Sequence, residues 1–174
     1  MAITEYVTFH GDPYALAGEP VEVDTPARDF TLIRFQDGQQ GTFELPQLLA
    51  SGKPSLISVI TSVDTPVGSL QAKTFDGLLV EHATRVNALL VSSDLPFTLN
   101  RFHATEGLQV LVGFSDYYGD FGKRYGVLIE DPRILTRAVF VLDAAGVVRY
   151  VEVVPEITHE PDYRSALAAL VGLV

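Results

Sequence analysis

The stretch that decides the fold runs from residue 55 to residue 68 and reads Ser55-Leu56-Ile57-Ser58-Val59-Ile60-Thr61, then Ser62-Val63-Asp64-Thr65-Pro66-Val67-Gly68. Its first half is a nearly continuous apolar run rich in β-branched residues, which is typical of a parallel strand covered on both faces. In the second half, Thr65 is a favoured N-cap and Pro66 a favoured first helical residue. The stretch therefore predicts a βαβ unit of an α/β sheet, with the functional site where strand passes into helix.

Strands and helices continue to alternate on the C-terminal side of this unit. The helix from Pro66 is expected to place Leu70, Leu78 and Leu79, with His82 and Val86, near one face. Beyond it, the patterns predict a strand over 88–93, a helix capped by Asp94 with Pro96 in its first turn and Gly107 past its end, a strand over 110–114, a short helix within 116–125, a hairpin of 137–142 with 147–153, and a terminal helix within 161–173.

The N-terminal side reads as antiparallel strands. Residues 6–9 are expected to pair with 20–23 around a turn at 11–13, and a strand over 30–35 meets the turn dipeptide Asp37-Gly38. A short helix over 44–50 follows. The whole order predicts one domain spanning residues 1–174. It is an α/β three-layer sandwich with a mixed central sheet flanked by helices and an N-terminal β-hairpin.

Composition excludes several classes of partner. The chain has 174 residues, with 12 basic and 22 acidic side chains and a net charge of −10. Nucleic acids and anionic membranes need a cationic face, so neither is an expected partner. No stretch approaches the roughly 18 apolar residues of a membrane span, and the start Met1-Ala2-Ile3-Thr4-Glu5 does not resemble a secretory leader. A cytoplasmic protein is expected.

Cysteine is absent from the chain. Disulfides, thiolate zinc sites and thiol nucleophiles are therefore excluded. The four histidines are scattered and have no carboxylate-rich motif beside them, so no metal site is predicted. Neither a serine-nucleophile elbow nor a phosphate-cradling glycine motif occurs, and no cofactor is expected.

Ordered blocks along the chain carry a family resemblance. Together they resemble the thiol peroxidases of the peroxiredoxin superfamily over essentially the whole length. The blocks are Phe9-His10-Gly11-Asp12-Pro13, the loop 62–68, Ser92-Ser93-Asp94-Leu95-Pro96-Phe97, Arg101-Phe102-His103-Ala104-Thr105-Glu106-Gly107-Leu108, Tyr125-Gly126-Val127, Arg137-Ala138-Val139, and Glu156-Ile157-Thr158-His159-Glu160-Pro161-Asp162-Tyr163.

The resemblance implies a thioredoxin-like fold, a homodimer and thioredoxin-dependent reduction of hydroperoxides by a peroxidatic and a resolving cysteine. It places Thr65 at the active-site threonine and Arg137 at the assisting arginine. At the remaining positions the chain departs from the family. Thr61 replaces the motif's proline, Gly68 the peroxidatic cysteine and His103 the resolving cysteine.

A thiolate is required for this chemistry, so the cysteine cycle is impossible with the atoms of this chain. We therefore expect a non-catalytic pseudo-peroxidase, a homodimer that binds a ligand in the old pocket or a partner on the old redox face. One alternative is a residual enzyme that holds a peroxide or oxyanion with Thr65 and Arg137 for an external thiol or cofactor. Another is a regulatory subunit pairing with an active peroxidase, and thioredoxin itself is a further candidate partner.

Three local features are left with two interpretations each. Unpaired N–H groups of residues 67–69 and the missing side chain at Gly68 would give an enlarged anion pocket, unless water or neighbours fill it. His103 is expected at the solvent or at the edge of the core, rather than as a ligand. The aromatic run of Tyr117, Tyr118, Phe121 and Tyr125 is either core or interface.

Overall fold

A computed structural model describes residues 5–174, and the start at residues 1–4, on which the prediction of no leader rests, lies outside the described part. The chain forms eleven strands, five α-helices and one 3-10 helix among these residues. In chain order they are β1 Tyr6–Phe9, β2 Asp12–Ala17, β3 Thr31–Gln36, β4 Gln39–Glu44, α1 Leu45–Leu49, β5 Ser55–Val59, α2 Pro66–Leu79, the 3-10 helix η1 Val80–His82, β6 Asn87–Ser92, α3 Pro96–Glu106, β7 Val112–Ser115, α4 Asp120–Arg124, β8 Leu128–Ile129, β9 Ile134–Leu135, β10 Ala138–Leu142, β11 Val148–Val153 and α5 Tyr163–Val171.

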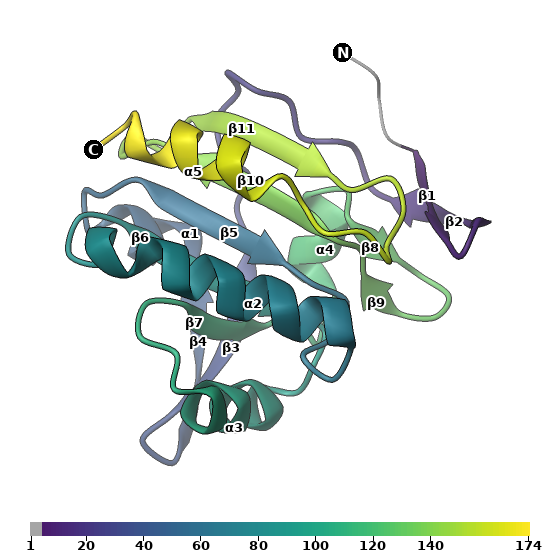
Figure 1. Cartoon of the computed structure of the whole chain (residues 1–174), viewed down its shortest axis with the longest axis horizontal. Coiled ribbons are helices and arrows are strands. Elements are labelled where there is room, and N and C mark those ends of the chain that lie inside the picture. The colour runs from purple at the N-terminus through teal and green to yellow at the C-terminus, as the bar shows by residue number, and fades with distance from the viewer. Residues whose placement is uncertain (1–4) are drawn as a thin grey trace.

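The predicted three-layer sandwich is confirmed. Seven strands form a mixed sheet in the order β11-β10-β5-β6-β7-β3-β4, in which β5, β6 and β7 run parallel and the other pairs antiparallel. Helices α2, α3 and α5 cover one face, and α1 and α4 cover the other (Figure 1). Strand β5 is central and all five of its residues are buried, as the continuous apolar run predicts.

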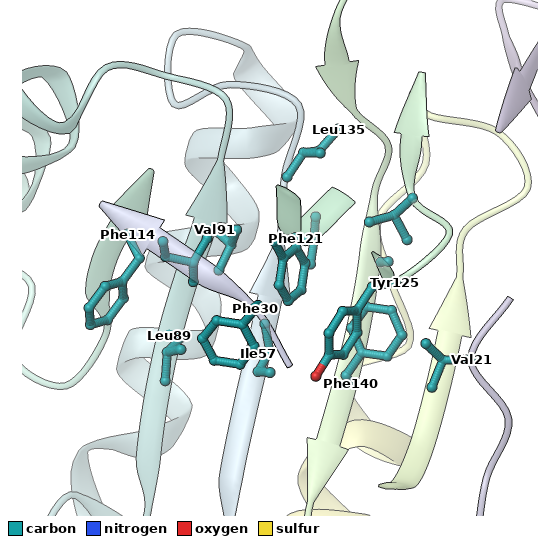
Figure 2. Packing of buried hydrophobic residues seen from close by; sticks show 14 of the residues in the cluster. Val21, Phe30, Ile57, Leu89, Val91, Phe114, Phe121, Tyr125, Leu135 and Phe140 are labelled. Atoms are coloured by element: carbon teal, nitrogen blue, oxygen red, sulfur yellow. The ribbon is translucent and has the colours of Figure 1, made fainter. Parts of the chain in front are cut away.

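The core on the α1 and α4 side is built around aromatic rings (Figure 2). The rings of Phe121 and Tyr125 stack with centroids 4.3 Å apart, and the Tyr125 hydroxyl donates to the Arg28 carbonyl oxygen at 2.7 Å. Both side chains are fully buried, whereas Tyr117 and Tyr118 are exposed. The aromatic run is therefore divided: its second half is core, and its first half faces solvent.

On the other face of the sheet, α2 does not bury the residues that the sequence suggested. Leu70 and Leu78 are exposed, and the buried stripe follows Ala72, Phe75 and Leu79. Of the expected set, only Leu79 lies on this helical stripe; Val86 is buried after the helix has ended, and His82 is half-buried in η1. The sequence pattern did not show this buried face, because two of its residues, Gln71 and Asp76, are polar. Their side chains interrupt the apolar period of 3.6 residues.

The N-terminal hairpin exists, but its return strand was predicted too late. His10 and Gly11 both have positive φ (51° and 88°), as in a tight two-residue hairpin turn, so the chain returns at once through β2. Residues 20–23 form no strand. Strand β2 instead pairs with β8, giving a small second sheet of order β1-β2-β8-β9. Strands β4, β8 and β9 were not predicted, because β4 is mostly polar and exposed, with Phe43 as its one large apolar residue, and the other two have only two residues each.

The short helix expected within 116–125 covers only α4. The three residues at 116–118 form a loop, and the Asp116 carboxylate accepts hydrogen bonds from the N–H groups of Phe121 and Gly122 at 2.9 and 2.8 Å. That acceptor satisfies the start of the helix from outside it. None of the helices between Glu5 and Val174 is long and apolar enough to cross a membrane.

Candidate functional site

The loop that joins β5 to α2 is anchored by Asp94 at the end of β6. The Asp94 carboxylate accepts hydrogen bonds from the Ser62 hydroxyl at 2.7 Å, the Val63 N–H at 2.9 Å and the Ser92 hydroxyl at 2.7 Å. The sequence predicts Asp94 as the cap of α3, and this prediction is wrong. The N-cap residue is Leu95, which makes no side-chain hydrogen bond to the helix. The carboxylate lies nearer to the donors of the neighbouring loop, and it fixes the shape of that loop.

Thr65 is the N-cap of α2, as predicted. Its hydroxyl accepts from the Gly68 N–H at 3.1 Å and donates to the Ser62 carbonyl oxygen at 2.8 Å, while the Ser69 N–H donates to the Thr65 carbonyl oxygen at 3.0 Å. Two of the three N–H groups expected to be free, those of residues 68 and 69, are thus already bonded. The helix N-terminus is closed by its own loop and does not form an open anion pocket.

Gly68 is buried, and the space beside it is filled. A Cβ atom added at Gly68 would lie 2.1 Å from the Ser62 carbonyl oxygen and 2.6 Å from the Thr65 hydroxyl oxygen. Real Cβ atoms do not approach backbone oxygen so closely. Of the two interpretations left open by the sequence, the geometry favours a space filled by a neighbouring group over an enlarged pocket: the Ser62 carbonyl occupies the place where a side chain at position 68 would begin.

Arg137, just before β10, is a fully buried cation. Its Nε donates to the Ile157 carbonyl oxygen at 2.9 Å, and its Nη1 donates to Gln71 Oε1 at 2.8 Å. Among residues 5–174, no carboxylate lies within 4.0 Å of the guanidinium. Burial lowers the pKa of Arg137, and the nearby Tyr163 and Glu160 partly oppose that effect.

Gln71 is the residue of this site that the sequence reasoning missed. Its Nε2 donates to the Ser58 hydroxyl at 2.9 Å and to the Val59 carbonyl oxygen at 3.3 Å, so it links the guanidinium to the end of β5. The only available signal was a polar residue one turn after Gly68, on a helix whose neighbouring positions are apolar. Arg137 is thus held by an amide oxygen and a carbonyl oxygen, and neither of these two partners carries a charge.

His103 lies on α3, half-buried, at the edge of the core that Phe102 enters. This agrees with the expected position at the edge of the core. An exposed ion pair, Arg101 with Asp64 at 3.9 Å, joins α3 to the loop before α2. In the described part of the chain, no group of three or more His, Asp or Glu side chains is arranged to hold a metal ion.

A cleft of about 250 Å³ opens beside the loop. Three hydroxyl-bearing residues of the loop form one wall, and apolar side chains from the N-terminal hairpin, the β8–β9 turn and the segment after β11 form the others. The lining carries no charge. Its residues are Phe9, Tyr14, Thr61, Ser62, Thr65, Ile129, Pro132, Ile134 and Ile157.

Glu156 holds the hairpin wall of this cleft in place. Its carboxylate accepts from the Gly11 N–H at 2.9 Å and the Thr8 hydroxyl at 3.1 Å, and its second oxygen accepts from the Thr158 N–H and hydroxyl at 2.9 and 2.6 Å. Hydrogen bonds from Thr158 and Gly11 lower the pKa of Glu156 to about 2. Glu156 therefore stays ionised, and keeps its hydrogen bonds to the hairpin, at all but strongly acidic pH.

Comparison with known proteins gives a consistent result. The Redoxin family model matches residues 22–167. A thiol peroxidase of Halalkalibacterium halodurans is 42% identical over 167 residues, covering 94% of this chain and 95% of that protein. A thiol peroxidase of Mycobacterium tuberculosis (strain ATCC 25618 / H37Rv) is 40% identical over 167 residues, covering 94% and 97%.

Solved structures agree on the fold. A peroxiredoxin-like protein from Aquifex aeolicus covers 100% of both chains with a TM-score of 0.86 at 30% identity. A thiol peroxidase from Chromobacterium violaceum covers 98% of both chains with a TM-score of 0.83 at 24% identity. The expected thioredoxin-like architecture is confirmed.

Proposed function

The chain belongs to the Redoxin family and, within it, to the thiol peroxidases, so that it is a peroxiredoxin-like antioxidant protein by descent; because it has no cysteine, we propose that it is a non-catalytic member that binds an apolar ligand. One observation carries the proposal. The Ser62 carbonyl fills the space in which a side chain at Gly68 would stand.

Peroxide consumption tests the non-catalytic part of the proposal. The purified chain is mixed with hydrogen peroxide or cumene hydroperoxide and a thioredoxin system, with the Halalkalibacterium halodurans thiol peroxidase as the positive control. We expect no consumption above buffer and chelator controls. Sustained turnover by the native chain, with thioredoxin or with glutathione, would show that this loop performs peroxide chemistry without a protein thiol, and the proposal would fail.

The cleft supports the ligand-binding part. Six of its nine lining residues are apolar or aromatic, and the three hydroxyl groups of Thr61, Ser62 and Thr65 gather at the loop. Apolar surface removed from water contributes roughly 25 cal/mol per Å², and an uncharged lining favours a neutral molecule. We propose a compact neutral ligand that places its apolar surface against the isoleucines of the lining.

Binding is measured with 1-octanol as the probe, by following the amide resonances of the chain in solution. The expected result is a saturable shift at residues 61–65, 129–134 and 157. A matched pair of variants gives the control: Ile134→Asp puts a charge in the lining, whereas Val174→Asp puts the same charge on an exposed residue far along the chain. Equal binding by both variants, or shifts elsewhere only, would contradict this location.

The residual-enzyme alternative has less support. It needs the Thr65 hydroxyl and the Arg137 guanidinium to face a peroxide. The Thr65 hydroxyl is bonded to Ser62 and Gly68, and the Arg137 guanidinium to Ile157 and Gln71. The Thr65 hydroxyl has one proton, which it already donates to Ser62, and it would have to break that bond before it could donate to an oxyanion, at a cost of about 1 kcal/mol or more.

We also propose that the chain is a homodimer, in the cytoplasm, and that it associates through an apolar patch beside the α3 start. Four large side chains are exposed there, Leu95 at 45%, Phe97 at 53%, Tyr117 at 48% and Tyr118 at 68%. The two segments that carry them, the start of α3 with Leu95 before it and the turn after β7, are joined by the Ser115 hydroxyl, which donates to the Asp94 carbonyl oxygen at 2.5 Å. Clustered aromatic residues of this kind are enriched in interface cores.

Sedimentation of the native chain and of Phe97→Asp tests the dimer. We expect a dimer that becomes a monomer on substitution, while Leu70→Asp, an equally exposed leucine on α2, stays dimeric. A native monomer at all concentrations would refute the proposed association. A regulatory complex with an active peroxidase predicts a different result, namely a 1:1 complex when that relative is added.

A further inference from the structure

A second pocket lies at the opposite end of the parallel strands from the loop 61–65. It has a volume of about 290 Å³ and sits where β5, β6 and β7 begin, between the β3–β4 hairpin and the segment before β6. Its lining residues are Arg34, Phe43, Leu48, Lys53, Ala83, Val86, Asn87, Ala88, Leu89, Gln109, Val110, Val112 and Phe114. None of them lines the first cleft, so the two sites are separate.

The charge of this pocket is opposite to that of the chain. The protein carries 22 acidic and 12 basic residues, yet the thirteen lining residues include two cations, Arg34 and Lys53, and no acidic side chain. Within the part of the chain that the structure describes, neither cation has a carboxylate within 4.0 Å. Both are half-buried, so solvent screens them less than it screens a surface charge.

Aromatic packing sets the position of one cation. The Arg34 guanidinium carbon lies 5.6 Å from the centroid of the Phe114 ring, and the Phe43 and Phe114 rings are 4.4 Å apart. A guanidinium over a ring face retains its N–H edge for a planar oxyanion. The amide nitrogen of Asn87 is already committed to Ser51 and Ser55 at 2.7 and 3.1 Å, so the two cations remain the main donors.

One acidic side chain, Asp76, is bonded to backbone N–H groups of the lining but is not itself part of the lining. The Asp76 carboxylate accepts from the N–H groups of Gln109, Val110 and Leu111 at 2.8 to 3.1 Å, and it is buried behind these residues. It serves as an anchor for the chain before β7. The positive charge of Arg34 and Lys53 is thus left for a molecule from solution.

We infer that this pocket binds a small organic anion, with its carboxylate or phosphate group between Arg34 and Lys53 and a compact apolar part against Val86, Val112 and Phe114. A purely inorganic ion would leave the apolar lining unused. A neutral ligand would leave the two cations of the lining without a charged partner. This inference is independent of the proposed function, because it involves no residue of the first cleft.

Phenyl phosphate is the probe, with inorganic phosphate and phenol as its two halves, and binding is followed through the amide resonances of the full chain. We expect saturable shifts at residues 83–88 and 109–114 with phenyl phosphate. Inorganic phosphate should bind about tenfold more weakly and phenol should not saturate, and added salt should weaken the phosphate-bearing probe. Equal affinity for the two phosphates would overturn the apolar half of the inference.

Two single variants keep the test clear of folding effects. Lys53→Gln and Arg34→Gln are each expected to weaken phenyl phosphate by about tenfold or more, the loss of one charge-assisted hydrogen bond. Lys123→Gln removes the same charge from an exposed residue outside the pocket and should bind as the native chain does. Undiminished binding by Lys53→Gln and Arg34→Gln, or no saturable shift with either phosphate, would overturn the inference.

Discussion

Placing a methyl group at Gly68 tests the closure of the loop more directly than any activity assay. The Cβ of Gly68→Ala would start 2.1 Å from the Ser62 carbonyl oxygen, whereas ordinary contact begins at 3.4 Å. The oxygen must therefore retreat by 3.4 − 2.1 = 1.3 Å. It is backbone and is tied to the Thr65 hydroxyl at 2.8 Å, so the movement strains the loop and disturbs the N-cap of α2.

The magnitude follows from three effects. Overpacking a tight site costs about 1–3 kcal/mol. Losing the N-cap hydrogen bond costs about 1 kcal/mol. Replacing glycine by alanine inside a helix gives back about 1 kcal/mol. We expect a net loss of about 1–3 kcal/mol of unfolding free energy, or a melting temperature lower by about 2–4 °C for each kcal/mol.

Urea unfolding and thermal melting measure this change, and the chain provides a matched control. Gly77 lies on the same helix, exposed, and a Cβ added there would meet nothing within 4 Å. Gly77→Ala should therefore stabilise the protein by up to about 1 kcal/mol. The two substitutions make the same chemical change on one helix and are expected to have opposite signs.

The reasoning is refuted if Gly68→Ala is as stable as Gly77→Ala, because the space beside Gly68 would then be open. The same geometry bears on the restored enzyme. Gly68→Cys combined with His103→Cys returns both thiols but not the space for the first one. We expect this double variant to be destabilised, with peroxide consumption far below that of the Halalkalibacterium halodurans thiol peroxidase. Full activity would show that the loop opens at little cost.

Three further changes have definite expected results. Asp94→Ala leaves two donors of the loop and the Ser92 hydroxyl of β6 without their acceptor and should lower the unfolding free energy by about 2 kcal/mol; faster amide hydrogen exchange at residue 63 checks it, and unchanged exchange would contradict the anchoring role. Gln71→Leu strands one guanidinium N–H of Arg137 in the core at a cost of about 2 kcal/mol in urea unfolding, whereas Gln71→Glu keeps the acceptor for Arg137 but loses the donor to the Val59 carbonyl oxygen, so it should recover only part of that loss. Burial raises the pKa of Asp116 from 3.8 to about 6, against the opposing hydrogen bonds from Gly122 and Phe121, so its protonated form favours the fold. The stabilisation is complete below pH 3.8 and is lost as the pH rises through about 6; relative to Asp116→Asn, the native chain should lose about 3 kcal/mol over that window, and parallel pH profiles would disprove the shift.

Much of the fold was accessible from sequence because its signals are local. The buried run at 55–61, the N-cap pair Thr65 and Pro66, and the hairpin around 143–146 each depend on residues next to one another in the chain. The errors arose where tertiary contacts decide the outcome. Asp94 had the position of a cap, yet its carboxylate is taken by donors from residues 62 and 63 of another loop. No local sequence pattern indicates which donors a carboxylate will bind when the donors lie in another loop.

The candidate site shows the same division. Ordered motifs brought Thr65, Gly68 and Arg137 to attention, and Gln71 now joins Gly68 and Arg137 through one helical turn and one hydrogen bond. The sequence also showed that no thiol exists. It did not show what replaced the missing side chain, because a carbonyl oxygen belongs to every residue and leaves no signature. Only the path of the backbone places the Ser62 oxygen beside Gly68.

The position of the Ser62 oxygen also means that regaining a cysteine at position 68 is harder than losing one. A single mutation that restored cysteine at position 68 would meet a backbone oxygen and weaken the protein before any chemistry returned. Recovery would need the loop to be rebuilt first, and such a change brings no benefit on its own while the thiol is absent. Selection cannot easily reward the two steps one at a time. The closed loop therefore makes a return to the cysteine chemistry of its relatives harder than the loss of that chemistry.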